Sequence, residues 1–419
     1  MKLSNIKTGF AKYKLIIENF SYITLLQIFV VISPLITYPY LIDVIGQELY
    51  GWVITANVLC SYVIIVVNFG TDGVCAKYVS VNRNDIPKLS NIVSSVLAGR
   101  FLLWIVSLML YMAVVLLIPS YRAHALVFFF TFGQSFDVLL FPQYFFQGME
   151  RMKISSLLNI GVKLFFILLI FVVVKEPADY LLVPLCYTIG FLIAGCISLT
   201  ILRREFKIKF VIPHWNDILR YFRESSSLFA TDIVCTIKDK FNYLLLGQIN
   251  MGSVVVYDLG AKLTALLARP GTIIATVLFP KFAQTRNVKW FKIVLLSEIA
   301  IVLFLVLLVN IFLEQIVVYM IGEPVDIVAL RLFTVAPIFL AASSFISTNF
   351  YIAFGYNRYT FYSILVTTAG YLTLLLFFYV RNDLNNIYSF VIVTVFTYFI
   401  ELVYRLLTCR KLLKKNHNV

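Results

Sequence analysis

Long apolar segments alternate with short polar segments along almost the whole chain. Each apolar segment reaches the roughly 20 residues that a helix needs to cross a bilayer, and no polar segment is long enough to hold a folded domain. The pattern predicts an all-α integral membrane protein with about twelve transmembrane helices. These helices are expected at 15–42, 49–75, 89–118, 123–148, 154–174, 179–202, 225–247, 254–280, 291–319, 327–354, 359–380 and 386–408.

The longest polar segment, residues 203–224, divides the predicted helices into two groups of six. We therefore expect an N-terminal lobe at 1–202, a cytoplasmic linker at 203–224, and a C-terminal lobe at 225–419 that ends in a short basic tail. Because each lobe holds an even number of helices, both lobes run in the same direction, and a repeat between them would be parallel rather than inverted.

Two short motifs recur at matching places in the two halves. Ile45–Gly51 (IGQELYG) follows the first predicted helix, and Leu246–Gly252 (LGQINMG) follows the seventh. Gly148–Arg151 (GMER) ends the fourth, and Gly355–Arg358 (GYNR) ends the tenth. Their similar offsets along the chain favour an internal repeat.

Composition supports the membrane assignment, and charge gives an orientation. Hydrophobic residues make up 61% of the chain and charged residues only 13%, about half the charged share of a soluble protein. The net charge of +14 does not indicate nucleic-acid binding, because the basic residues lie between apolar runs rather than on a polar domain. The termini and one set of alternate loops hold 25 of the 35 Lys and Arg residues, whereas the opposite loops hold only Arg122, Lys175 and Arg381. By the positive-inside rule, both termini and the linker are cytoplasmic.

Signatures of enzymes, metal sites and cleaved leaders are missing from the sequence. The six Cys residues are scattered without metal-ligand spacing, and His124, His214 and His417 lie in loops or tails. There is no Gly-rich phosphate-binding loop. The first apolar segment is too long for a signal peptide and lacks a cleavage site, so we expect it to stay as the first helix. We predict no enzymatic activity, no metal and no cofactor.

The apolar segment Val254–Phe279 carries three charged residues, Asp258, Lys262 and Arg269. Their spacing of four and eleven residues places them within about 40° on one helix face. A charge at bilayer depth costs at least about 2.5–3.5 kcal/mol, so this face should contact protein or water rather than lipid. Pro270 beside Arg269 is expected to kink the helix.

Three stretches resemble one known family. They are Ile45–Arg100 (IGQELYGW…NFGTDGVCAKYVSVNRNDIPKLSNIVSSVLAGR), Phe141–Met152 (FPQYFFQGMERM) and Tyr257–Ala283 (YDLGAKL…LFPKFA). The chain resembles bacterial O-antigen flippases, the Wzx-type polysaccharide transporters, within the superfamily that includes multidrug exporters and peptidoglycan-precursor flippases. The resemblance implies two six-helix lobes around a central cavity that opens alternately to each face of the bacterial inner membrane.

The resemblance also implies a substrate and partners. The substrate would be an undecaprenyl-pyrophosphate-linked oligosaccharide, an O-antigen or related repeat unit, moved from the cytoplasmic to the outer leaflet. Membrane lipid is a further partner, as are the polymerase and the chain-length proteins of the same pathway.

Cations inside the predicted helices are candidates for binding an anionic pyrophosphate, since Arg offers a bidentate fork and Lys a mobile charge. These candidates are Arg100, Lys163, Lys262, Arg269 and Arg331. Alternatives remain open: Lys262 could pair with Asp258, Lys163 could pair with Asp137, Arg269 could bind helix carbonyls, and Arg331 could extend to the membrane surface.

Carboxylates inside the helices are candidates for coupling transport to a proton or sodium gradient. They are Asp137, Asp232, Asp239, Asp258 and Glu298. Salt bridges with neighbouring Lys residues, such as Lys238 and Lys240, are the alternative.

Two other functions fit less well. An ion-coupled exporter of cationic drugs would favour a cavity dominated by carboxylates, whereas this chain offers many cations. A membrane enzyme such as the polymerase of the same pathway would be expected to carry a substantial outer loop, and the outer loops here are short.

Overall fold

Helices account for all regular secondary structure in the part of the chain that the structure describes. This computed structural model describes residues 22, 25–26, 29–30, 33–322 and 325–417. The chain forms two compact units, Met1–Ile233 and Val234–Val419, and the boundary between them falls within one long helix, α11 (Trp215–Gly247). The predicted all-α fold is confirmed.

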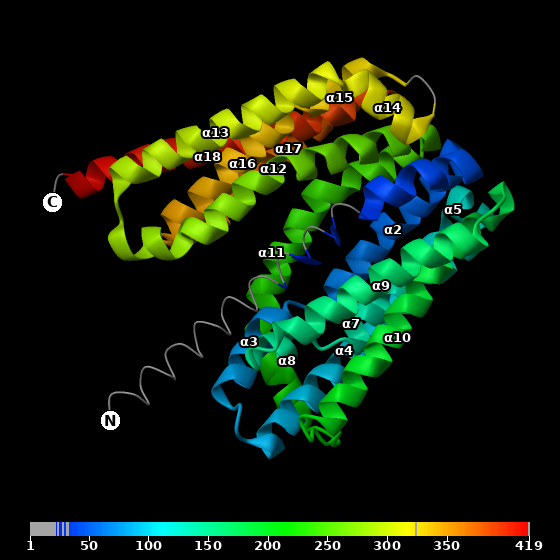
Figure 1. Cartoon of the computed structure of the whole chain (residues 1–419), viewed down its shortest axis with the longest axis vertical. Coiled ribbons are helices and arrows are strands. Elements are labelled where there is room, and N and C mark those ends of the chain that lie inside the picture. The colour runs from blue at the N-terminus through cyan, green and yellow to red at the C-terminus, as the bar shows by residue number, and fades with distance from the viewer. Residues whose placement is uncertain (1–21, 23–24, 27–28, 31–32, 323–324, 418–419) are drawn as a thin grey trace. The chain divides into compact units, whose positions relative to one another are not determined.

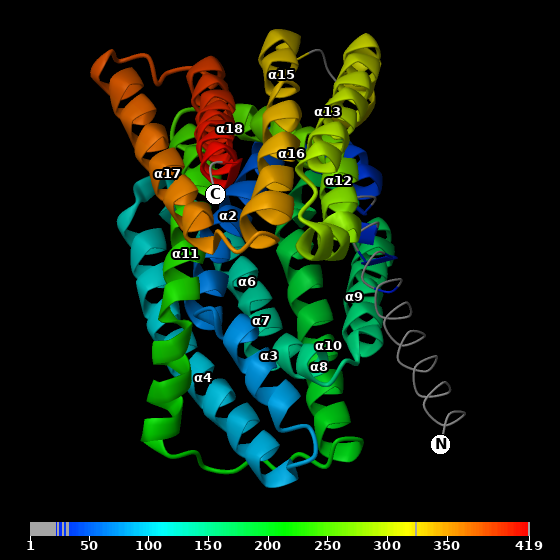
Figure 2. The same ribbon diagram turned by 90° about the vertical axis from the view of Figure 1, so that its left-hand side faces the viewer.

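The first unit contains nine helices from α2 to α10 together with the start of α11, and residues 33–45 are also helical. In order, they are α2 (Gln47–Asn68), α3 (Thr71–Val81), α4 (Ile86–Leu117), α5 (Pro119–Ala123), α6 (Ala125–Phe132), α7 (Phe136–Leu140), α8 (Gln143–Gly148), α9 (Met152–Val173) and α10 (Leu182–Arg204), with 3-10 turns at Gly133–Ser135 and Pro177–Leu181. Helix α9 packs along α10 (Figure 2). Pro142 separates α7 from α8, because a proline disfavours helical backbone at the residue before it and Phe141 is accordingly extended.

Local side chains also determine where α4 begins. Asp85 is its N-cap, and its side chain accepts a hydrogen bond of 3.0 Å from the backbone N–H of Lys88. That bond, together with the nearby Lys88 ammonium, lowers the pKa of the Asp85 carboxyl. Pro87, in the first turn, suits a position where its missing N–H is not needed.

The second unit contains the end of α11 and seven further helices. They are α12 (Met251–Thr285), α13 (Val288–Ile311), α14 (Leu313–Ile321), α15 (Ile327–Phe333), α16 (Ala336–Ile346), α17 (Asn357–Val380) and α18 (Ile387–His417), with a π-helical segment at Ser347–Ile352. Helix α16 packs against α12, α13 and α18, and α17 packs along α18 (Figure 1). Helix α12 continues through Pro270 and Pro280.

Ten helical segments among the described residues are long and apolar enough to cross a membrane. They overlap ten of the twelve predicted spans, from Gln47–Val81 to Ile387–Lys414. The predicted span 225–247 lies in α11, which is helical throughout but contains too many polar residues to qualify by composition. Part of the predicted span 15–42 lies outside the described residues, and its described residues, 22, 25–26, 29–30 and 33–42, are helical. The chain is therefore a multi-pass helical membrane protein.

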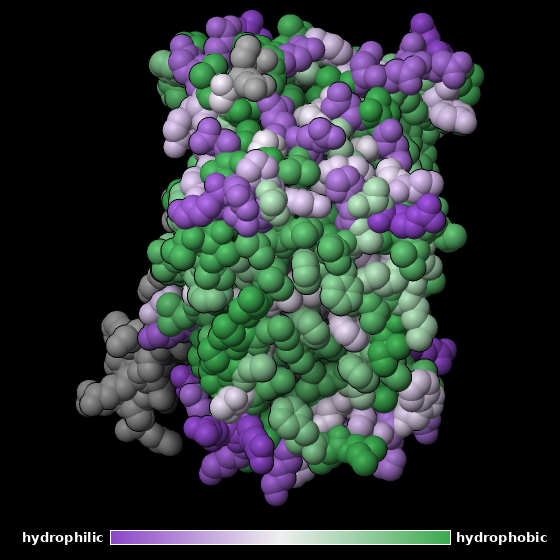
Figure 3. Space-filling view, turned by 90° about the vertical axis from the view of Figure 1, so that its right-hand side faces the viewer, coloured by the Kyte–Doolittle hydropathy of each residue, from purple (hydrophilic) through white to green (hydrophobic). Residues whose placement is uncertain are grey.

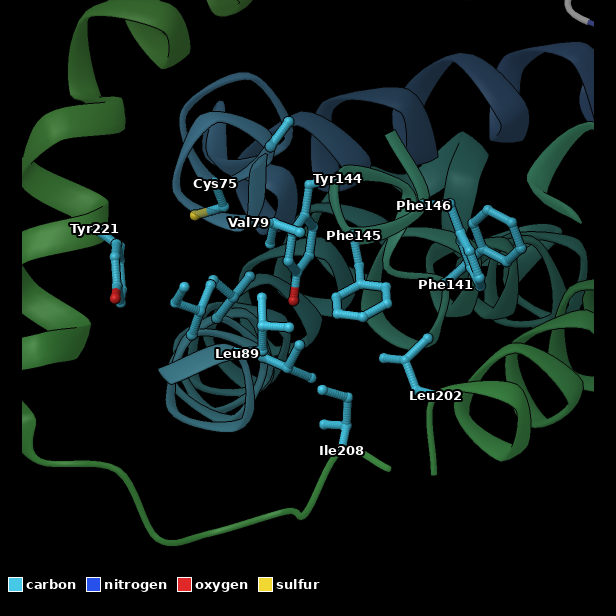
Figure 4. Close-up of a cluster of buried hydrophobic side chains, with 14 residues drawn as sticks. Cys75, Val79, Leu89, Phe141, Tyr144, Phe145, Phe146, Leu202, Ile208 and Tyr221 are labelled. Atoms are coloured by element: carbon cyan, nitrogen blue, oxygen red, sulfur yellow. The ribbon is translucent and has the colours of Figure 1, made fainter. Parts of the chain in front are cut away.

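A large apolar core in the first unit contains the motif at Phe141–Met152. Phe141, Tyr144, Phe145 and Phe146 are all buried there (Figure 4). They meet Leu89 of α4 and further residues of α3 and α10. The motif therefore owes much of its pattern to packing.

The segment 203–224, predicted as a linker, packs on the first unit. Ile208 and Tyr221 belong to the same apolar core. The backbone N–H groups of Lys209 and Val211 each donate a hydrogen bond of 3.0 Å to a serine hydroxyl of α4.

Many large apolar side chains are exposed on the outer faces of the helices, including Leu110, Leu117, Leu168 and Val172. Figure 3 shows hydrophobic side chains gathered into a broad area over one face of the molecule, with hydrophilic side chains beyond its edges. Apolar areas of this extent indicate contact with a membrane.

Candidate functional site

Arg100 on α4 is held by protein groups inside the first unit. Its side chain is 1% exposed. The guanidinium donates to the Thr71 hydroxyl, to the Asn68 amide oxygen at 2.7 Å, to the Val138 carbonyl at 2.7 Å and to the Asp72 carboxylate at 2.9 Å. A buried charge is tolerated when it is paired and hydrogen-bonded in this way.

These hydrogen-bond partners indicate a structural role for Arg100. They lie on or beside α2, α3 and α7, and the Tyr144 ring on α8 lies 5.3 Å from the guanidinium carbon. Arg100 thus joins several helices of the first unit. Its binding to substrate stays a prediction, and in this conformation the donors of its guanidinium face protein acceptors.

Asp137 on α7 and Lys163 on α9 lie within electrostatic reach of each other. Asp137 also interacts with Asp72 and Arg100. Among the predicted residues of this unit, Asp137 thus interacts electrostatically with both Arg100 and Lys163, without a direct hydrogen bond to either.

In the second unit, the predicted charged stripe of α12 divides into two parts. Lys262 forms an ion pair with Asp258, one turn earlier on the same helix. The Asp258 carboxylate is largely buried and also accepts a hydrogen bond of 3.3 Å from the Tyr243 hydroxyl. This pair is one of the alternatives that the sequence left open for Lys262.

Arg269 differs from these residues. It is partly buried on α12, and no side-chain hydrogen bond or ion pair joins it to any residue that the structure describes. The adjacent Pro270 lacks an N–H, so the carbonyl four residues earlier loses its usual helical donor. Arg269 is therefore a cation within a spanning helix that has donors to offer a ligand.

The remaining predicted charges have varied surroundings. Arg331 forms an exposed pair with Glu314 at 3.3 Å, and Asp232 is exposed. Asp239 pairs with Lys238 at 2.6 Å. Glu298 is 1% exposed.

A small cavity of about 80 Å³ with a mixed polar and apolar lining lies within the second unit, and Lys238, Asp239, Tyr257, Thr264 and Tyr398 supply polar groups to it. The Lys238 ammonium also lies 4.9 Å from the centre of the Tyr398 ring. The space is large enough for a few water molecules and far too small for an oligosaccharide. It can hold water or a small polar group beside the Lys238–Asp239 pair.

Beside this cavity is a hydrogen-bond network that the sequence analysis missed. The Asn242 amide nitrogen donates to Tyr257 and Thr394, each at 3.0 Å, and its oxygen accepts from the Tyr371 hydroxyl at 2.8 Å. An asparagine inside the predicted transmembrane span 225–247 was the available signal. Its partners lie on three other helices, so sequence spacing could not find them.

Arg405 is a second finding that differs from the sequence analysis. Residue 405 falls inside the predicted helix 386–408, but its charge was counted with the cations of the cytoplasmic C-terminus; in the structure it lies within α18 and is 5% exposed. It pairs with Glu401 at 2.6 Å and donates to the Ser343 carbonyl at 2.8 Å. Like Arg100, it joins helices inside its own unit.

Within the described ranges, no group of three His, Cys, Asp or Glu residues is placed to hold a metal ion.

Comparisons with known proteins agree with the fold. Residues 16–286 match the family described as "Polysaccharide biosynthesis protein". A "Putative O-antigen transporter" of Escherichia coli (strain K12) is 24% identical over 270 residues, which are 64% of this chain and 65% of that protein. A protein of the same name from Shigella dysenteriae is 23% identical over 61% of this chain and 65% of its own length. The matched region thus covers just under two thirds of both relatives.

Two solved structures share the architecture. The "Lipid II flippase MurJ, inward closed conformation" superposes with a TM-score of 0.73 at 15% identity, covering 92% of this chain and 87% of that one. An inward-facing multidrug resistance MATE family transporter of the MOP superfamily gives 0.59 at 13% identity, covering 92% and 99%. At these identities the likeness concerns the fold.

Proposed function

Because the chain belongs to the polysaccharide biosynthesis protein family, we propose that it translocates a lipid-linked oligosaccharide across the bacterial inner membrane. The substrate is an undecaprenyl-pyrophosphate-linked repeat unit of O-antigen or a related polysaccharide. It moves from the cytoplasmic to the outer leaflet by alternating access, and a proton or sodium gradient drives the cycle. Both termini are cytoplasmic in this account, as the distribution of Lys and Arg predicts.

The observation that carries the proposal is Arg269. A partly buried guanidinium in a spanning helix, without a side-chain partner among the described residues, is suited to an anionic group that arrives with the substrate. A pyrophosphate matches the fork of an arginine, and such charge-assisted hydrogen bonds are stronger than neutral ones. The Lys262–Asp258 pair, two to three turns earlier on α12, supplies further polar groups on the same helix.

Export of cationic drugs is less well supported, because three of the predicted carboxylates interact with lysines and a fourth, Glu298, is 1% exposed and so is closed to a drug, which leaves only the exposed Asp232. A cationic drug needs carboxylates that are free to bind it. In the second unit Asp258 is paired with Lys262, and Asp239 is paired with Lys238. In the first unit Asp137 lies within electrostatic reach of Lys163.

Deleting this protein tests the proposal in cells. We expect undecaprenyl-linked repeat units to accumulate in the inner leaflet and surface polysaccharide to fall, measured by lipid extraction and by surface labelling. Drug resistance should stay unchanged. Normal surface polysaccharide in a strain without a redundant flippase, or new sensitivity to cationic drugs, would contradict it.

A further inference from the structure

Glu298 is a buried carboxyl without a hydrogen-bond partner. It lies on α13 and is 1% exposed, and neither of its carboxyl oxygens has a partner among the described groups. Leu295 and Val302, one turn to either side on the same helix, are buried in two neighbouring apolar clusters. The carboxyl therefore lies where these two clusters meet.

The carboxyl rests directly against the backbone of α12. A Cβ atom added at Gly271 would lie 2.2 Å from Glu298 Oε1 and 3.1 Å from the Ala341 Cβ of α16. The carboxyl fills the space that a side chain at position 271 would need, so a larger residue there would displace the Glu298 carboxyl. Gly271 follows Pro270, which already removes one hydrogen bond from this turn of α12.

No charged group on the surrounding helices neutralises Glu298. Helix α16 has no charged residue, and α14 carries only Glu314, which pairs with Arg331. Helix α12 carries Asp258, Lys262, Arg269 and Lys281, and the rest of α13 carries Lys289 and Lys292. None of these forms an ion pair or a hydrogen bond with Glu298. Arg269 precedes Gly271 by two residues, about 200° around the helix, so it points away from this contact.

We propose that Glu298 is a proton-binding site whose charge controls the packing of α13 on α12. A neutral carboxylic acid can stay between apolar side chains, whereas an unpaired carboxylate cannot do so without a large loss of solvation. When Glu298 releases its proton to water, the carboxylate must gain water or a cation, and this requires α13 to separate from Gly271. Rebinding of one proton restores the packed arrangement.

Proton binding at Glu298 could couple a proton gradient to movement of the helices. The helix that Glu298 packs against is also the helix that carries Lys262 and Arg269. A change in the α12–α13 contact at Gly271, two residues from Arg269, would alter the position of a proposed substrate-binding cation. This consequence rests on the proposed function, whereas the proton site itself does not.

Infrared spectroscopy of the purified, full-length protein in lipid tests the proton site without any substrate. The wild-type difference spectrum between pH 5 and pH 9 should contain the carbonyl band of a protonated carboxyl in an apolar environment. Glu298→Gln should remove this band, and Glu314→Gln, the same change at an exposed glutamate, should leave it. Gly271→Ala, which displaces the carboxyl, should shift the band. A band that is unchanged in both Glu298→Gln and Gly271→Ala would overturn the proposal.

Hydrogen exchange tests the coupling to helix packing. After correction for the intrinsic pH dependence, peptides of α12 and α13 should exchange faster at high pH in the wild type and show no such change in Glu298→Gln. The same pH response in both proteins would overturn the role in packing. These readouts are independent of translocation, so a failed transport assay with a positive infrared result would overturn the proposed function and leave the proton site standing.

Discussion

At the residue scale, two arginines that lie in similar apolar sequence segments have different surroundings in the structure. Arg100 and Arg269 both interrupt apolar helices, and both were predicted to bind substrate. Arg100 donates to four acceptors of the first unit and is almost fully buried. Arg269 has no side-chain partner in the described part of the chain and stays partly exposed. We therefore expect substitution of Arg100 to affect stability first and substitution of Arg269 to affect transport first.

Replacing Arg100 should destabilise the first unit. Arg100→Ala leaves the Asp72 carboxylate without its ion-pair partner and several acceptors without a donor, and we expect the free energy of unfolding to fall by about 3 kcal/mol. Denaturant titration of the protein in detergent measures this loss. Arg122→Ala, at an exposed position, is the control and should change stability by less than about 0.5 kcal/mol. Equal stability of the two variants would contradict the structural role.

The contacts of the candidate site could be predicted only where the two interacting residues are close in the sequence. The Asp258–Lys262 pair follows from i, i+4 spacing, and the sequence suggested it. The partners of Arg100 are separated from it by 28 to 38 residues, and those of Asn242 by up to 152. Such partners depend on tertiary packing, which periodicity does not determine.

At the scale of elements, the long apolar segments predicted most helices but not their interruptions. The sequence predicted one helix over 291–319, whereas the structure ends α13 at Ile311 and begins α14 at Leu313. Arg405 falls inside the predicted helix 386–408 and was counted among the cytoplasmic cations, yet α18 continues to His417 and buries this side chain. A cation near the end of a helix indicates which side of the membrane that end faces only if the residue at which the helix ends is known.

Gly148 of the GMER motif and Gly355 of the matching GYNR motif are glycines for different local reasons. A Cβ at Gly148 would lie 2.6 Å from the Val79 Cβ and 2.7 Å from the Ala76 carbonyl oxygen. At Gly355 there is open space, but the backbone has a φ of +87°. The glycine common to both motifs is therefore explained by close packing of α8 on α3 in the first unit and by a left-handed backbone conformation in the second unit. In contrast, Tyr144 and Tyr351, each four residues before its glycine, are both buried.

Alanine at each glycine separates these two reasons. Gly148→Ala should destabilise by about 1–3 kcal/mol, since the Ala76 backbone cannot move aside easily. Gly355→Ala should cost about 1 kcal/mol, the usual penalty for a left-handed backbone with a side chain. Unfolding titrations compare the two directly. A larger loss for Gly355→Ala than for Gly148→Ala would contradict the packing explanation.

At the scale of the whole molecule, the proposed function rests on family membership and on a small set of charged residues. The charges that hold each unit together, Arg100 and Arg405, are buried and satisfied. The charges proposed for function, Arg269 and Glu298, lie on neighbouring helices of the second unit and have no side-chain partner in the described part of the chain. Function is thus proposed to reside in the groups that the fold leaves unsatisfied.

The most direct test is translocation by the purified protein in liposomes that contain an undecaprenyl-pyrophosphate-linked oligosaccharide, with the glycan in each leaflet measured by its accessibility to an added glycosidase. We expect the wild type to move the glycan between leaflets. Arg269→Ala should slow this about 10- to 100-fold, because a charge-assisted contact of about 1.5–3 kcal/mol is lost. Arg269→Lys should retain part of the rate, and Lys289→Ala, an exposed cation of α13, should retain all of it. No translocation by the wild type, or an Arg269→Ala variant as fast as the wild type, would contradict the account.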